Sequence, residues 1–188
     1  MGTYALGVEY NGKDFSGWQK QLDRLTIQGS LEKALSQVAA SEIRLSAAGR
    51  TDAGVHSMGQ VASFRSEVAR SSEQWRRGVN SLTPDSINVA WVNEVEDDFH
   101  ARFSAKKRWY KYEIINRRPP LTIDANRAWC VYKNLNIQKI KNESSSFLGK
   151  HDFNAFRSSH CQSKTSIKTI DSFDIKNENK KIIFKISA

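Results

Sequence analysis

The chain has 188 residues, with 29 Lys and Arg against 20 Asp and Glu, a formal net charge of +9 and a pI of about 9.6. Two cysteines, Cys130 and Cys161, are too few for a disulfide framework or a metal-ligand cluster, and a reducing, cytoplasmic compartment is the simpler interpretation. No apolar run approaches the roughly 20 residues that span a bilayer. Residues 1–100 carry a net charge of −3 and residues 101–188 carry +12. This asymmetry suggests a surface for a polyanion, with nucleic acid first among the options, and a solvated basic face is the alternative that charge alone leaves open.

Alternating apolar residues predict a first strand over residues 4–10, followed by a polar loop over residues 11–26. Ser30 is predicted to cap a helix, because apolar residues recur after it with the spacing of one helix face. The rest of this half is predicted as two strands over residues 44–48 and 59–64, a helix that carries Trp75, Val79 and Leu82, and a further strand over residues 87–95. Either Ser71 or Ser72 is predicted to cap that helix. The order β-α-β-β-α-β is the ferredoxin-like pattern, which a common RNA-binding fold shares.

The same order then begins again. The predicted elements are two strands, a helix and two strands, over residues 109–115, 127–132, 136–148, 167–175 and 181–186. A second β-α-β-β-α-β unit would need one more helix and strand. We therefore predict an α+β protein with two ferredoxin-like halves and mostly antiparallel sheets, the second half incomplete. The predicted domains are residues 1–105 and residues 106–188.

One octapeptide, Gly49 to His56, reads GRTDAGVH and precedes an apolar, strand-like run. It places Asp52 between two glycines, with Arg50 two residues before it. Glycine permits backbone angles that other residues resist, and it lets another chain approach closely. A carboxylate held in such a turn beside a cation stays ionised and can act as a nucleophile or a base. The alternative is an aspartate that caps its own turn.

This octapeptide resembles the signature of the tRNA pseudouridine synthases that modify the anticodon arm, and similar blocks run from about Tyr4 to the end of the chain. The further blocks that resemble the family lie at residues 10–19, 26–35, 99–105, 108–112 and 149–157. The resemblance implies an isomerase that converts uridine to pseudouridine at nucleotides 38, 39 and 40 of tRNA. It also implies a homodimer that uses no cofactor and no metal.

The resemblance implies three site residues. Asp52 is the expected catalytic nucleophile, and it acts at uracil C6 or at the sugar C1′. Arg50 is expected to bind substrate by displacing the target base from its stack, which costs a few kcal/mol, while the simpler alternative is an ion pair with Asp52. Tyr110 is expected to stack on the target uracil, against the alternative of a half-buried strand tyrosine, which is preferred for Tyr112. For His56 we prefer a role in holding the turn over that of general base.

Nine cations could line a phosphate-binding surface and would make binding strongly salt-dependent. They are Arg102, Lys106, Lys107, Arg108, Lys111, Arg117, Arg118, Arg157 and Lys164. The remaining histidines, His100, His151 and His160, have no metal-ligand spacing, so a zinc site is not predicted.

In the family, the last strand found here leads into a helix with a further arginine that pairs with the catalytic aspartate. The resemblance therefore implies that this chain is a C-terminally truncated form, which could be inactive. The main alternative function is a non-catalytic RNA-binding module, which explains the basic half but leaves the Asp52 loop without a purpose. A glycosidase is less favoured, because it normally needs two carboxylates that flank the scissile bond.

Overall fold

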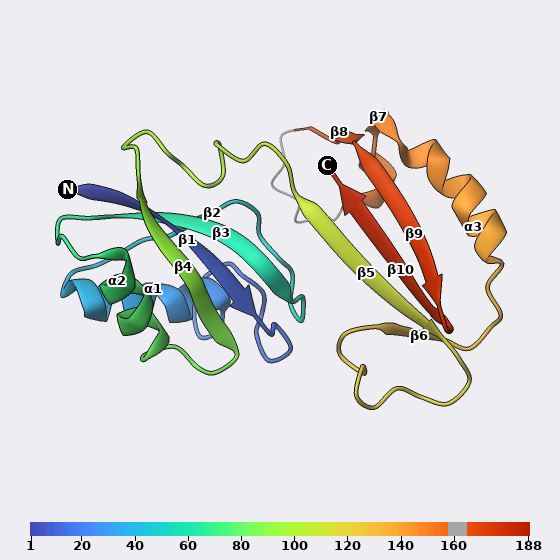
Figure 1. Ribbon diagram of the computed structural model, residues 1–188, viewed down its shortest axis with the longest axis horizontal. Coiled ribbons are helices and arrows are strands. Elements are labelled where there is room, and N and C mark those ends of the chain that lie inside the picture. Colours follow the sequence, from blue (N-terminus) through green and yellow to red (C-terminus); the bar gives the residue numbers. More distant parts are fainter. Residues whose placement is uncertain (158–164) are drawn as a thin grey trace. The chain divides into compact units, whose positions relative to one another are not determined.

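The structure is a computed structural model that describes residues 1–157 and 165–188. The chain divides into two compact units, Met1–Ala105 and Lys106–Ala188 (Figure 1). Both combine helices with sheets whose strands are mostly antiparallel, so the predicted α+β class is confirmed.

The first unit contains four strands and two helices in alternating order. In chain order they are β1 (Gly2–Tyr10), α1 (Ile27–Ala39), β2 (Ser46–Ala47), β3 (Ser57–Ser66), α2 (Ser72–Asn80) and β4 (Ile87–Val95). The sheet order is β2-β3-β1-β4, and each neighbouring pair is antiparallel. β1 is therefore a central strand, and its last residue, Tyr10, pairs with Ser57 at the start of β3.

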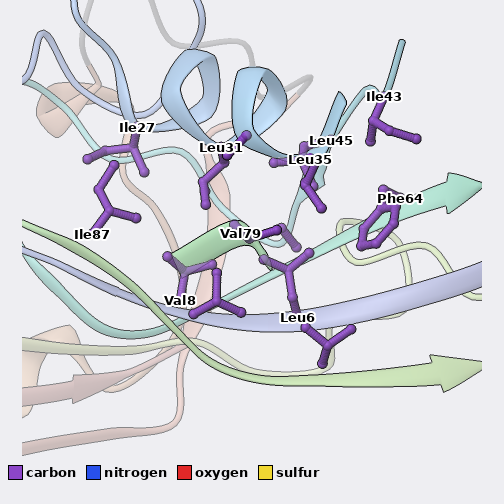
Figure 2. Packing of buried hydrophobic residues seen from close by; sticks show 14 of the residues in the cluster. Leu6, Val8, Ile27, Leu31, Leu35, Ile43, Leu45, Phe64, Val79 and Ile87 are labelled. Carbon is purple, nitrogen blue, oxygen red and sulfur yellow. The ribbon is translucent and has the colours of Figure 1, made fainter. Parts of the chain in front are cut away.

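The core of this unit lies between the sheet and its two helices (Figure 2). Leu6 and Val8 of β1 meet Leu31 of α1 and Val79 of α2, and all four side chains are at most 1% exposed. Burying an aliphatic side chain of this size contributes about 1.5–3 kcal/mol relative to leaving it exposed. The core therefore holds both helices on one face of the sheet.

Helix α1 begins one turn earlier than predicted. Thr26 rather than Ser30 is the N-cap, since the Thr26 hydroxyl accepts a hydrogen bond from the Gly29 backbone N–H at 3.2 Å. The prediction was wrong because Gly29 has a low helix propensity, which made the first turn look like loop. Ser71 caps α2 as predicted, and it forms a reciprocal capping box with Gln74.

The second unit is built on a mixed sheet and a small hairpin. Its elements are β5 (Trp109–Asn116), β6 (Trp129–Val131), α3 (Ile137–Ser144), η1 (Ser145–Phe147), β7 (Gly149–Asp152), η2 (Asn154–Phe156), β8 (Ile167–Ile170), β9 (Ser172–Glu178) and β10 (Lys181–Ser187). The main sheet has the order β6-β5-β10-β9, in which only β5 and β6 are parallel among the described pairs. β7 and β8 form a separate antiparallel pair.

Two predictions for this unit were wrong in detail. The single strand expected over residues 167–175 is divided at Asp171 into β8 and β9, because β8 pairs with β7 while β9 pairs with β10. The helix expected over residues 136–148 ends at Ser144 and continues as a 3₁₀ turn. Its apolar residues face the sheet only in part, since no residue of α3 is buried.

Candidate active site

The Gly49–His56 loop connects β2 to β3 in the first unit. It leaves and re-enters the sheet beside the end of β1, because Ala48 donates its backbone N–H to Val61 C=O and Ser57 pairs with Tyr10. The Gln60 side chain donates a hydrogen bond to the Gly49 carbonyl and ties the start of the loop to β3. The loop is therefore anchored at both of its ends.

The segment that follows β1 holds the middle of this loop. Trp18 donates its backbone N–H to the Thr51 carbonyl at 2.9 Å, and Gly54 donates its own to the Phe15 carbonyl at 3.3 Å. The Tyr10 hydroxyl lies 2.8 Å from the Thr51 hydroxyl. Each such bond contributes about 0.5–1.5 kcal/mol net, and Phe15, Trp18 and Tyr10 also belong to the buried core. The loop is thus fixed to the most rigid part of the unit.

Close approach at this site depends on glycines outside the octapeptide. A Cβ on Gly12 would lie 1.9 Å from the Val55 carbonyl oxygen, and one on Gly17 would lie 2.8 Å from that of Thr51. Gly17 also has a φ of +89°. Gly54 has a φ of +79°, which agrees with the predicted need for an unusual backbone angle. A Cβ added to Gly54 would have no atom within 4 Å, so close approach is not the reason for glycine at this position.

His56 holds the turn. Its Nδ1 accepts a hydrogen bond from the Gly12 backbone N–H at 3.2 Å. The contact agrees with the preferred interpretation of His56 as a loop residue.

Asp52 lies at the exposed tip of the loop. Its backbone carbonyl accepts a hydrogen bond from the Val55 N–H at 3.2 Å, which closes the turn without the side chain. Within residues 1–105 no hydrogen bond or ion pair to the Asp52 carboxylate is found, so this aspartate does not cap its own turn. The main chain is held while the carboxylate is exposed to solvent.

Arg50 is also exposed and lies two residues before Asp52 on the same loop. Among the ion pairs of the described residues there is none between Arg50 and Asp52. The simple ion pair that was the alternative for Arg50 is therefore not the arrangement found here.

Tyr10 supports the site and was not predicted to do so. Burial raises the pKa of the Tyr10 hydroxyl, although hydrogen bonds with Thr51, Gln60 and Ser57 lower it. The phenol is therefore neutral near pH 7 and serves as a hydrogen-bonding support for the loop. The available signal was the Tyr10-Asn11-Gly12 block, which the family resemblance includes but which periodicity assigns only to a strand end.

A buried polar network fixes the chain just before β2. Glu32 of α1 accepts hydrogen bonds at Oε1 from the Gln28 side chain at 2.9 Å and from the Leu45 backbone N–H at 3.0 Å. Gln28 also donates to the Leu45 carbonyl and accepts from the Lys20 backbone N–H, at 3.2 and 3.1 Å. Lys20 Nζ lies 3.2 Å from the other Glu32 oxygen. Since buried polar groups are costly unless they are paired, this network specifies one position for the approach to the loop.

Tyr110 belongs to the second unit, on β5, and its side chain is 56% exposed. Tyr112 was predicted to be the more buried of the two tyrosines, but it is 55% exposed, so exposure does not distinguish it from Tyr110. Tyr110 pairs with Ile186 of β10, which places both residues on one face of the sheet. The structure describes Tyr110 and the Asp52 loop within separate units.

The predicted basic residues have different surroundings. Lys107 forms an ion pair with Asp171 at 2.9 Å, and Lys111 forms one with Glu113 at 2.6 Å. The Arg102 guanidinium lies 5.6 Å from the centre of the Phe103 ring. Lys164, with His160 and Cys161, lies outside the described residues.

Across residues 1–157 and 165–188, no group of three or more His, Cys, Asp or Glu side chains is placed to hold a metal ion. In the same residues, no helix has both the length and the apolar character to cross a membrane.

Comparison with known proteins decides the family. The family model described as tRNA pseudouridine synthase matches residues 7–104 and 144–188, and the first of these segments contains the whole Asp52 loop. The chain belongs to the tRNA pseudouridine synthase family. This is a family of isomerases that act on tRNA.

Its relatives include proteins named tRNA pseudouridine synthase A. That of Nitrosomonas eutropha is 44% identical over 97% of this chain, and that of Buchnera aphidicola subsp. Schizaphis graminum is 46% identical over 98%. The Ehrlichia chaffeensis protein is also 46% identical over 98% of the chain. The chain spans 66%, 70% and 76% of the length of these three relatives.

Proposed function

We propose that this chain is a tRNA pseudouridine synthase that isomerises uridine in the anticodon stem-loop, at nucleotides 38, 39 and 40, with Asp52 as the nucleophile. The observation that carries the proposal is the Asp52 loop itself. Three main-chain and hydroxyl contacts fix it to the core, while the carboxylate remains exposed and uncapped. Such preorganisation is what a positioned catalytic group requires.

The reaction needs only groups that the protein can supply. The N1–C1′ glycosidic bond breaks, the uracil turns, and a C5–C1′ bond forms, while the C5 hydrogen leaves as a proton and N1 gains one. No net oxidation or reduction occurs. Asp52 provides the carboxylate that adds to uracil C6 or acts at C1′, which are the two routes open to a nucleophile here.

Two further residues have proposed roles in binding the substrate. Arg50, exposed beside Asp52, displaces the target base and contacts backbone phosphate. Tyr110 stacks on the released uracil, and its 56% exposure leaves an aromatic face available for a base. A flipped base stacked on an aromatic ring gains roughly 1–3 kcal/mol, which offsets the cost of leaving the helix.

The proposal extends to architecture and partners. We propose that the first unit is a ferredoxin-like domain, supported by its β-α-β-β-α-β order and its β2-β3-β1-β4 sheet, and that residues 106–188 form a second domain of the same kind. The proposed partner is tRNA, bound by a cytoplasmic homodimer without a cofactor. That a C-terminal segment of the family is missing from the second domain stays a prediction.

The test is tritium release from tRNA transcripts that carry 5-³H-uridine. The parent chain is expected to release tritium, and Asp52→Ala and Asp52→Asn to release none above background. Asp85→Asn, which alters an equally exposed aspartate away from the loop, is the matched control and is expected to act like the parent.

The alternative, a non-catalytic RNA-binding module, predicts a different result. The parent would then bind tRNA without releasing tritium, and Asp52→Asn would bind it as well or slightly better because a negative charge is removed. If the parent were inactive, adding the family's C-terminal segment would separate a truncated enzyme from a binding module, since only the enzyme would gain activity.

A further inference from the structure

A concave pocket of about 380 Å³ lies at the end of the second unit's main sheet, where β5 ends and β10 begins. Its lining includes Asn116, Arg117, Arg118, Tyr132, Asn134 and Lys180. The turn between β9 and β10 and the chain on either side of β6 meet at this end of the sheet (Figure 1).

Asn116 builds the walls of this pocket. Its Nδ2 donates hydrogen bonds to the carbonyls of Val131 and Lys133, both at 2.7 Å, and its Oδ1 accepts one from the Leu135 N–H at 3.3 Å. Its backbone N–H donates to the Lys180 carbonyl at 2.8 Å. The side chain and the backbone of this one residue therefore join the end of β6 and the loop after it to the β9–β10 turn, and the walls are set before any ligand arrives.

Arg117 is also held in place. Its Nε donates to the Pro119 carbonyl at 3.0 Å and its Nη2 to the Pro120 carbonyl at 2.8 Å. These carbonyls orient the guanidinium without neutralising it, because carbonyl oxygens carry no full charge. Less side-chain entropy is lost when an oriented cation binds an anion.

Two more cations complete the lining. Arg118 and Lys180 are exposed, and within the described part of the chain neither has an ion pair. Lys180 lies in the short turn between β9 and β10 and has a φ of 70°. Positive φ angles are typical of tight hairpin turns, so the backbone of Lys180 is part of a short turn and not of a long loop. Among the described lining residues there are three cations and no carboxylate. The neighbouring Lys181, by contrast, forms an ion pair with Glu113 at 2.6 Å.

We propose that this pocket binds a backbone phosphate of the RNA substrate, at a position separate from the Asp52 loop; the proposal rests on tRNA being the substrate. Arginines in fixed geometry suit phosphate oxygens, and Lys180 adds a point charge. Asn134 brings an amide donor. Tyr132, 57% exposed, offers a ring beside the phosphate for the attached sugar or base. The volume exceeds that of a phosphate alone, so the pocket fits a phosphodiester with part of its nucleotide.

The test measures the salt dependence of tRNA binding by fluorescence anisotropy, with a tRNA transcript and KCl from about 50 to 200 mM. The variant is Arg118→Ala/Lys180→Ala. The matched control is Lys33→Ala/Lys141→Ala, which removes the same charge from exposed positions on α1 and α3. For each phosphate that the variant no longer neutralises, the slope of log K against log salt should shrink by about 0.7–0.9, and binding at about 50 mM KCl should weaken roughly tenfold.

Equal slopes and affinities for the variant and the control would overturn the proposal. Inorganic phosphate, added at constant ionic strength, is expected not to displace tRNA at a few millimolar. Displacement from the parent but not from the variant would show a site for free phosphate instead. Tritium release measured on the same samples separates the two proposals. Intact release with an unchanged slope rejects only the pocket. A reduced slope without any release by the parent supports the pocket, and it rejects the catalytic role only if the chain stays inactive after the family's C-terminal segment is added.

Discussion

The two units differ in how deeply they are packed. In Met1–Ala105 a cluster of 20 buried apolar residues joins the sheet to both helices. In the described part of Lys106–Ala188 only Ile114, Ile182 and Ser187 are buried. The deep core lies directly under the segment that clamps the Asp52 loop. A catalytic group needs a rigid support, and the unit with the deeper core provides one.

The two units also differ in charge, and here the second unit is the one that stands out, because it carries the excess of positive charge. Residues 1–105 carry 11 Lys and Arg against 13 Asp and Glu, whereas residues 106–188 carry 18 against 7. The second unit also exposes Trp109, Tyr110 and Tyr112 on β5. Binding a phosphate backbone depends on cations at the surface and on aromatic faces rather than on core depth. Under the proposed function, the first unit positions Asp52 and the second unit supplies most of the RNA-binding surface.

The largest expected effect comes from breaking the deep core. Leu31→Ala removes a fully buried side chain from α1 and should lower the free energy of unfolding by about 2–5 kcal/mol. Ile140→Ala on α3, where no side chain is buried, should cost about 1 kcal/mol. Urea unfolding followed by the fluorescence of the buried Trp18 and Trp75 reports on the first unit. A loss for Leu31→Ala no greater than that for Ile140→Ala would contradict the contrast in packing.

The next largest effect tests whether the contacts between the core and the loop position Asp52. Gly12→Ala would place a Cβ 1.9 Å from the Val55 carbonyl oxygen, so the loop has to move by more than an ångström. We expect stability to fall by about 1–3 kcal/mol and tritium release to fall roughly 100-fold. Gly59→Ala is the matched control, because its Cβ would meet nothing within 4 Å. Equal rates for the two variants would show that the clamp does not position Asp52.

Short sequence patterns correctly predicted the features that depend on residues close together in the chain. Alternation of apolar residues located β1, β4, β5 and β10 to within two residues at each end. Serine before an amphipathic run located the cap of α2. The octapeptide and the family resemblance located the Asp52 loop, which alternation alone would have described only as a turn.

The predictions that were wrong concern contacts between residues distant in sequence. The division at Asp171 follows from a change of pairing partner, from β7 for β8 to β10 for β9, and the local pattern located β10 but not β7. Likewise, Gly12 and Tyr10 support a loop about 40 residues away, and their hydrogen bonds with His56 and Thr51 exist only in the folded unit. The tertiary fold, rather than the local sequence, decides which residues hold the Asp52 loop.

The smallest expected effect tests the electrostatics of the second unit. Burial alone would raise the pKa of Glu113, but the ammonium groups of Lys111 and Lys181, each 2.6 Å away, lower it below its ordinary value of 4.5. Glu113→Gln should therefore cost about 1 kcal/mol near neutral pH. Because the pKa is lower in the folded state, this stabilisation is complete above about pH 4.5 and is lost as the pH falls through the folded-state value.

Urea midpoints of the parent and of Glu113→Gln, measured from about pH 7 to pH 3, should therefore converge on the acid side. Glu143→Gln, at an exposed position on α3, is the control and should follow the parent throughout. A difference that stays constant to the lowest pH would mean that Glu113 stabilises this unit through packing rather than charge. In that case the ion pairs of Glu113 with Lys111 and Lys181 would not explain its contribution to stability, and the second unit would depend on packing more than its few buried residues indicate.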